Sequence, residues 1–204
     1  MLQNSLTARE NYLWFADNNY LAARLLILNR FYIPGISVAQ QAVEQYLKLK
    51  IYELVDRESI KKTKIENCHN LVKLFKTVQK PMKINNLSLK EINHYLHLLT
   101  LLNNAYRFRY FDEKGVLGEL NKGKSVALGF TFEDLDRFDE LSCELRNSVF
   151  IKGQGGCPVN EAYKDKLFFK KTTIKGEIMH QNNKQYGKFK IRGQTMIEFY
   201  SRFR

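Results

Sequence analysis

The sequence has few cysteines, and they are not arranged as a metal site or a disulfide framework. Cys68, Cys143 and Cys157 are odd in number and far apart, and no Cys-x-x-Cys occurs. Closely spaced cysteine pairs are the usual sign of a zinc site, and an even set is the sign of a disulfide framework. We therefore expect a protein without a structural metal or a bound cofactor, in a reducing compartment.

Long apolar runs are also absent, which excludes a membrane span. Met1–Trp14 lacks the basic start and apolar core of a signal peptide, so we expect a cytoplasmic protein. The chain has 204 residues, of which 44% are hydrophobic and 26% are charged. This composition is typical of a globular protein with one well-buried core and an appended segment.

Positive charge is concentrated near the C-terminus. Residues 164–204 carry 11 Lys or Arg against 3 Asp or Glu, whereas residues 1–163 carry 22 against 18. A focused positive field attracts polyanions, which means nucleic acid or anionic lipid. The alternative is a solubilising tail without a specific partner.

Helical periodicity covers about three quarters of the chain. Thr7 with Glu10 forms a capping-box pattern at the start of the first helix. Pro34-Gly35 is predicted to end that helix, and Pro81 to end the third. The predicted helices are Thr7–Tyr32, Ile36–Asp56, His69–Gln79, one that starts near Ser88, and Phe132–Ile151.

The second helix has two different faces. Its apolar residues recur at helical spacing, from Ile36 to Leu54. Its other face carries Gln40, Glu44, Lys48 and Lys50.

Two glycine-rich segments divide the chain. Phe111–Gly129 is predicted to be a long loop, and long loops in compact domains are often functional. Gly153–Pro158 is the clearest linker. We therefore predict a mainly α protein, with an antiparallel four- or five-helix bundle over residues 1–152 and a small basic α+β or β extension over residues 153–204.

The extension is predicted to hold one short helix, Asn160–Lys171, and a small sheet of two or three strands. Turn signals at Lys175-Gly176, Asn182-Asn183 and Arg192-Gly193 separate the strands. The predicted strands are Thr172–Ile174, Glu177–Met179, Phe189–Arg192 and Met196–Tyr200.

Basic and aromatic residues alternate in this extension. Lys188, Lys190 and Arg192 are interleaved with Tyr186 and Phe189. Such alternation suits single-stranded nucleic acid, through phosphate contacts and base stacking. Any half-buried strand shows the same alternation, and the strands would equally complete a dimer interface.

Gly118–Ser125 matches the Walker A pattern Gly-x4-Gly-Lys-Ser. A P-loop needs a buried strand before it and a helix directly after it. The preceding Tyr110–Gly115 is charged and follows a helix, and Val126–Phe130 is too short for the required helix. We therefore do not predict a P-loop fold, although Lys122 and Lys124 remain candidate phosphate ligands.

Several segments together resemble HEPN domains, the family named for nucleotide binding in higher eukaryotes and prokaryotes. The stretch from Val38 to Lys48 resembles the family's second-helix signature, with a small residue and Gln, then Ala-hydrophobic-Glu and Leu-Lys. His69-Asn70-Leu71 with Leu74 resembles the start of its third helix. Arg107-Phe-Arg109-Tyr110 resembles its Arg-Tyr element. The similarity covers roughly residues 13–151.

This resemblance implies an antiparallel helical bundle that commonly forms homodimers, and in many members RNA cleavage or nucleotide binding. The family's ribonucleases use an Arg, often followed by a polar residue, and a His four to six residues beyond. Arg146-Asn147 fits the first part, but Ile151, Lys152 and Gly153 occupy the positions where the His would fall. Whether the protein is an enzyme therefore stays open.

An imidazole would have to come from elsewhere, and His69 is the candidate. With Arg146 and Asn147 it forms the candidate catalytic set. His94, His97 and His180 are interpreted as structural or solvent-facing. The candidate phosphate or nucleotide ligands are Arg107, Arg109, Tyr110, Lys122 and Lys124, and the candidate nucleic-acid ligands of the tail are Lys188, Lys190 and Arg192.

Two functional hypotheses follow. The first is a HEPN-like homodimer that binds RNA or a nucleotide, in a toxin–antitoxin, defence or RNA-processing setting, with ribonuclease as the enzyme class if it is one. The second is a non-catalytic dimeric scaffold for a partner protein. An antitoxin or another protein is a candidate partner in either case, and no membrane contact is expected.

Overall fold

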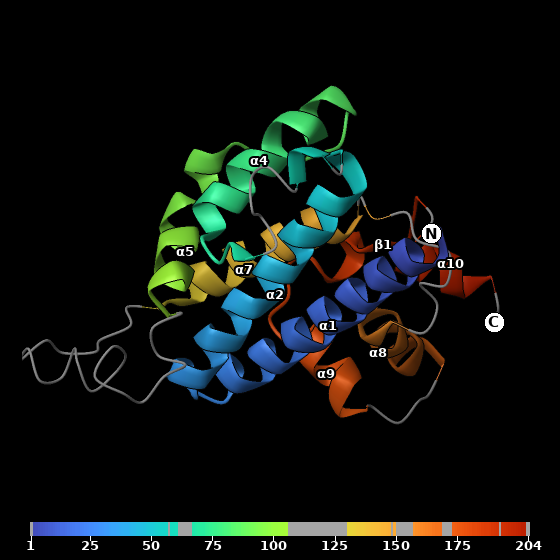
Figure 1. Cartoon of the computed structure of the whole chain (residues 1–204). Coiled ribbons are helices and arrows are strands. Elements are labelled where there is room, and N and C mark those ends of the chain that lie inside the picture. Colours follow the sequence, from blue (N-terminus) through green and yellow to red (C-terminus); the bar gives the residue numbers. More distant parts are fainter. Residues whose placement is uncertain are drawn as a thin grey trace, which may run out of the picture.

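The two longest helices, α1 (Leu2–Leu28) and α2 (Tyr32–Leu54), pair along their length as a hairpin (Figure 1). The computed structural model describes residues 2–56, 58–60, 67–105, 130–147, 149, 157–168, 173–191 and 193–202. Arg30, with a φ of 65°, ends α1 in the left-handed conformation. The Phe31 N–H then donates to the Leu26 carbonyl at 2.8 Å, which is the closing bond of a Schellman turn.

Pro34 and Gly35 lie near the start of the second helix, which begins at Tyr32. The prediction that they end the first helix was therefore wrong. Pro34 lies in the first turn of α2, where a missing N–H removes no helical hydrogen bond. Gly35 packs tightly against the end of α1, since a Cβ there would stand 2.8 Å from Cγ1 of Ile27. The Pro-Gly pair therefore helps to close the hairpin.

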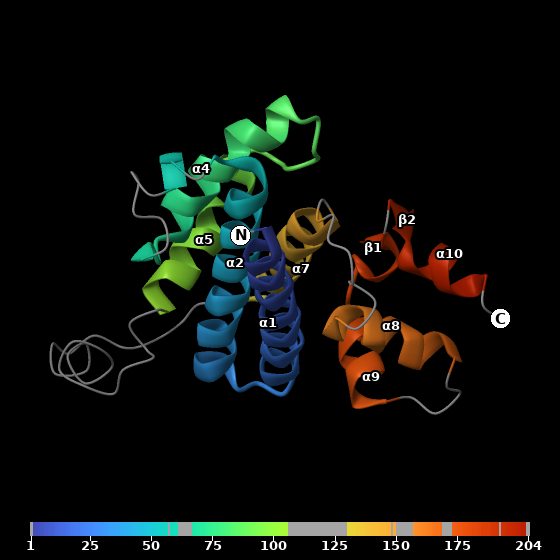
Figure 2. The same ribbon diagram turned by 45° about the vertical axis from the view of Figure 1, so that its right-hand side comes forward.

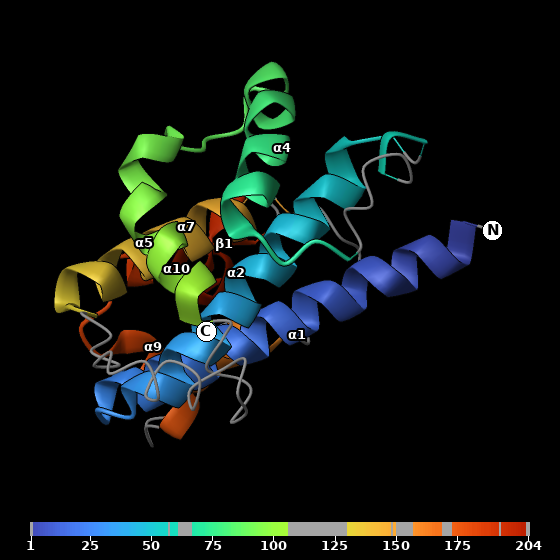
Figure 3. The ribbon, with the colours of Figure 1, turned by 60° about the vertical axis from the view of Figure 1, so that its left-hand side comes forward.

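Three further helices, α4 (Leu71–Ile84), α5 (Ile92–Ala105) and α7 (Phe132–Asn147), complete the bundle (Figure 3). The α4 helix continues past Pro81, contrary to prediction, because its apolar face extends to the buried Met82. The start of α5 lies later than the predicted Ser88. The backbone N–H of Lys90, just before α5, donates instead to the Glu144 carboxylate of α7 at 3.0 Å.

The extension is more helical than predicted. It contains α8 (Pro158–Phe168), α9 (Ile174–His180), the 3-10 turn η4 (Tyr186–Lys188) and α10 (Met196–Ser201). Its one described sheet is an antiparallel hairpin of β1 (Lys190–Ile191) and β2 (Gln194–Thr195). The prediction of a small sheet and of a turn at Gly193, whose φ is 79°, is therefore confirmed.

Three predicted strands fall at two helices, because threonine side chains cap these helices at their N-termini. Thr173 accepts the Gly176 N–H and starts α9, so the strands predicted over 172–174 and 177–179 were wrong. Thr195 and Glu198 form a full capping box that starts α10, where the strand over 196–200 was predicted. A satisfied N-terminus favours a helix even over a short β-branched or aromatic segment.

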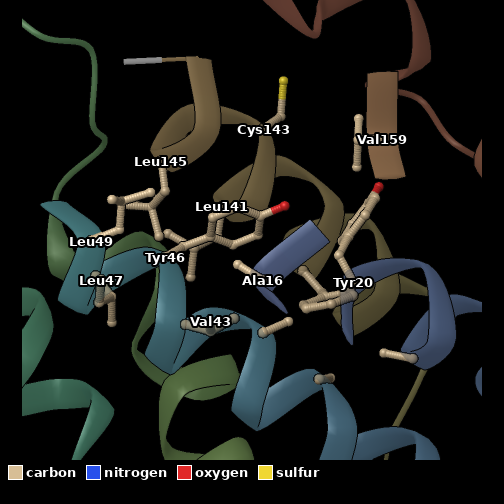
Figure 4. Close-up of a cluster of buried hydrophobic side chains, with 14 of the residues drawn as sticks. Ala16, Tyr20, Val43, Tyr46, Leu47, Leu49, Leu141, Cys143, Leu145 and Val159 are labelled. Carbon is tan, nitrogen blue, oxygen red and sulfur yellow. The ribbon is translucent and has the colours of Figure 1, made fainter. Parts of the chain in front are cut away.

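One apolar core runs through the bundle and the extension. Figure 4 shows Tyr20 of α1 beside Val159 of α8, with Tyr46 of α2 and Leu141 of α7 in the same cluster. Tyr163, Phe189 and Met196 of the extension are fully buried in the same cluster. Figure 2 shows the extension on one side of α1 and α2, with α4 and α5 on the other.

The polar face predicted for α2 is not exposed to solvent. Gln40, Glu44, Lys48 and Lys50 are all buried, each with an exposed fraction of 8% or less. Within the described ranges, no helix is both long enough and apolar enough to cross a bilayer.

A charged cluster joins α5 to α7. Glu140 of α7 binds the ammonium group of Lys90, and it accepts a hydrogen bond from Nε2 of His94 at 2.6 Å. Partial burial raises the pKa of Glu140, but the hydrogen bonds from Lys90 and His94 outweigh that effect and bring the pKa to about 2. The carboxylate therefore stabilises the fold wherever it is ionised.

We expect Glu140→Gln to change the acid dependence of stability. The wild-type protein should lose stability as the pH falls from about 4.5 toward 2, because protonation of Glu140 removes a contribution of at most about 3 kcal/mol. In the variant that part of the pH dependence disappears, as measured by urea unfolding at several pH values. The control is Glu133→Gln, whose side chain is 80% exposed; identical acid profiles for the two variants would contradict the assignment.

Candidate nucleic-acid interface

Arg146, the predicted catalytic arginine, is buried at the C-terminal end of α7 and is 2% exposed. Its Nε donates to Asp17 at 2.9 Å, and its terminal nitrogens donate to Asp17, Asn160 and the Lys190 carbonyl. Burial lowers the pKa of Arg146, but Asp17 more than compensates and the net shift is upward. The guanidinium is therefore a permanent cation that ties α7 to α1, α8 and β1.

Asp17 and Arg146 are half of a reciprocal arrangement. The helices α1 and α7 each carry an Asp followed seven residues later by an Arg, Asp17 with Arg24 and Asp139 with Arg146. Asp17 pairs with Arg146, and Arg24 pairs with Asp139, and all four side chains are buried. Both pairs form together only if α1 and α7 run antiparallel in this one register.

Arg24 also holds the extension. Its Nε donates to the Ile178 carbonyl at 2.9 Å, and another nitrogen donates to the Gln181 carbonyl at the end of α9. Burial raises the pKa of Asp139 to about 6, although Arg24 and the Tyr20 hydroxyl both act in the opposite direction. Through its bonds to the Ile178 and Gln181 carbonyls, the Arg24 guanidinium caps the C-terminus of α9, where a cation is favourable.

Asn147 forms hydrogen bonds with the backbone of Lys188 and Lys190 in the extension. Its Nδ2 donates to the Lys188 carbonyl at 2.8 Å, and its Oδ1 accepts the Lys190 N–H at 2.6 Å. Together with the bond from Arg146 to the Lys190 carbonyl, these contacts fix the path of the chain. The predicted catalytic pair therefore positions two of the predicted tail ligands.

The alternation predicted for this segment is confirmed. Phe189 and Ile191 are buried, with exposed fractions of 0% and 3%, whereas Lys188 and Lys190 are exposed. Tyr186 stacks on Tyr163 of α8, with ring centroids 4.7 Å apart, so both rings serve packing. We call the exposed side chains of Lys188 and Lys190 the basic edge.

His69 lies just before α4 and contacts α2. Its Nδ1 is 3.0 Å from Oε1 of Glu44, and its side chain is 46% exposed. Burial raises the pKa of Glu44, but hydrogen bonds from Lys48 and Gln40 help to bring it below its usual value. Glu44 is therefore a carboxylate that orients the ring, as carboxylates do in many histidine sites. The described contacts of His69 lead to α2, and those of Arg146 to α1, α8 and β1.

The remaining histidines take part in structural contacts. His94 binds Glu140, His97 is 3.4 Å from Asp134 across the α5–α7 boundary, and the His180 ring packs edge-on against Tyr186. Burial raises the pKa of Cys143 and of Cys157 to about 12. These two thiols are therefore poor nucleophiles at neutral pH.

Several predicted ligands lie outside the described residues. They include the whole of the Walker-like segment, and the side chains concerned are Arg107, Arg109, Tyr110, Lys122, Lys124 and Arg192.

The described ranges contain no group of three or more His, Cys, Asp or Glu side chains that would hold a metal ion. No family model, curated protein or solved structure matches the chain.

Sequence reasoning missed the buried charges of α1. Asp17 and Arg24 lie within the apolar stripe formed by Leu13, Tyr20 and Ile27, and both are fully buried. Charged residues are almost never fully buried unless they are paired. Asp17 and Arg24 lie inside the apolar stripe, and Asp139 and Arg146 repeat their spacing. This pattern was the available signal for buried ion pairs between the two helices.

We expect Arg146→Met to destabilise the protein strongly. The substitution leaves the buried Asp17 carboxylate without its cation, which typically costs about 3–5 kcal/mol. Urea unfolding would measure the loss. The control is Lys184→Met, because the Lys184 side chain is 75% exposed in its pair with Asp136 and exposed pairs contribute little. Similar losses for both variants would show that the buried pair is not the main contact.

Proposed function

We propose that this protein is a HEPN-like RNA- or nucleotide-binding protein that contacts phosphates through the basic edge. One observation carries the proposal: Arg146 and Asn147 bind the backbone around Lys188 and Lys190 and leave both ammonium groups exposed. Ammonium groups that project from a fixed backbone bind phosphate without first ordering the chain.

The charge distribution supports the same ligand. Most of the net charge of +12 lies in residues 164–204, and a local positive field speeds the capture of polyanions. The resemblance of residues 13–151 to HEPN domains adds a fold that commonly acts on RNA. The proposal includes a homodimer and a toxin–antitoxin, defence or RNA-processing setting, which rest on that resemblance by analogy.

Lys188→Gln/Lys190→Gln tests the basic edge. We expect weaker binding of a fluorescent 20-nucleotide RNA, and a salt slope (log K against log salt concentration) that is about 1.4 smaller, because each phosphate contact to a single strand contributes about 0.7. The control is Lys175→Gln/Lys184→Gln, which removes the same charge from the same extension. Equal effects of both variants would mean that only net charge matters. No binding by the parent at low salt would favour the scaffold hypothesis.

RNA cleavage is a second candidate function, and the contact between Glu44 and His69 favours it. A carboxylate that holds Nδ1 directs the other ring nitrogen outward. In cleavage without a metal, Nε2 of His69 would accept the proton of a ribose 2′-hydroxyl, while the 2′-oxygen attacks the adjacent phosphorus. The P–O bond to the 5′-oxygen then breaks. The products are a cyclic 2′,3′-phosphate and a 5′-oxygen that takes a proton from the imidazolium or from water and becomes a hydroxyl.

His69→Gln tests this second function. If the protein cleaves end-labelled RNA in the presence of EDTA, the variant should lose at least about 100-fold in rate, as is typical for removal of a general base. Glu44→Gln should reduce the rate less, because it affects only the orientation of the ring. A His69→Gln variant that cleaves at the parent's rate would exclude His69 from the chemistry.

A further inference from the structure

The exposed face of α4 is a row of lysines. Lys73, Lys76, Lys80 and Lys83 follow one another at intervals of three and four residues, which places them within an arc of about 80° at ~3.6 residues per turn. All four are exposed. The row is about 15 Å long at ~1.5 Å per residue, long enough to face several consecutive phosphates. We call these four residues the lysine row.

One carboxylate lies near this charge: Glu91, directly before α5, accepts a hydrogen bond from Gln79 of α4. Neither α4 nor the neighbouring α5 contains an Asp or a Glu, and in the described part of the chain no ion pair involves the lysine row. Neighbouring like charges destabilise a helix, and Lys73 in the first turn also opposes the helix dipole. Helix stability therefore does not explain the row.

An open groove lies beside the row. It has a volume of about 690 Å³ and is lined by residues of α4 and α5 and by Asn70. Lys73 and Lys76 line it, Val72 and Leu96 supply apolar surface, and the remaining lining comes from Asn70, Thr77 and Thr100. Leu96 is 43% exposed, so it offers apolar contact to a ligand. The groove thus combines cations with an apolar surface suited to bases.

A membrane fits this surface less well. A helix that lies on a bilayer inserts its apolar face, but the apolar face of α4, from Leu71 to Met82, is buried in the core. Apart from Ile84 at the last position of α4, which is 69% exposed, only the cationic side of the helix is available. A chain of phosphates with bases that reach past them matches both the row and the groove.

We propose that the lysine row and the α4–α5 groove bind single-stranded nucleic acid, with the phosphates along the lysines and bases against Leu96. The site shares its ligand class with the proposed function but none of its residues. It lies across α1 and α2 from the basic edge (Figure 2). Substitutions in one surface can therefore be tested without changing the other.

The test uses the full chain and a fluorescent 20-nucleotide oligouridine, with binding measured over a range of salt concentrations. Replacing all four lysines of the row with Gln should reduce the salt slope by about 3, because each lost phosphate contact contributes about 0.7. A second variant, Leu96→Gln, removes the apolar contact without changing charge and should weaken binding with little change in slope. The substituted positions are exposed, so the variants should keep the fold, and circular dichroism checks this.

Lys188→Gln/Lys190→Gln separates the two surfaces. An altered slope in the four-lysine variant supports the row, whatever the basic-edge variant does. An unchanged slope and affinity in the four-lysine variant overturns the row, even if the basic-edge variant binds weakly. Phosphatidylserine vesicles and a duplex RNA are the competing ligands. Loss of vesicle binding alone, or of duplex binding alone, would also overturn the inference.

Discussion

The reciprocal exchange of charge between α1 and α7 is the constraint on which the rest of the structure depends. Two buried carboxylates and two buried guanidinium groups satisfy one another across helices that are far apart in sequence. A shift of either helix by one turn would leave four charges without partners in the core, and each would cost several kcal/mol. Apolar packing alone tolerates small slips, whereas this arrangement does not.

The same charges also attach the extension to the bundle. Each guanidinium uses its remaining donors on backbone carbonyls of the extension, Arg24 on α9 and Arg146 on β1. An Arg has five N–H donors in a rigid plane and can serve several acceptors at once. The register of the bundle and the position of the basic edge are therefore set by the same side chains, which links the fold to the proposed binding surface.

Sequence periodicity was sufficient for the helices of the bundle, because each has a long apolar stripe. It failed in the extension, where α9 and α10 have only seven and six residues and threonine caps decide the conformation. The Thr195-x-x-Glu198 pattern was the local signal available for α10. At the candidate site, the exposure of Lys188 and Lys190 followed from alternation. The burial of Arg146 did not, because its partner Asp17 is 129 residues away and long-range pairing leaves no local pattern.

Asn147 holds the segment of Lys188 and Lys190 by main-chain atoms only. Docking therefore does not depend on which side chains occupy these two positions, and they can change while the strand stays in place. Selection, or an engineer, could make this edge acidic, aromatic or neutral without rebuilding the scaffold. The bundle would then be a rigid scaffold that presents variable side chains at positions 188 and 190, as a rigid framework carries variable loops.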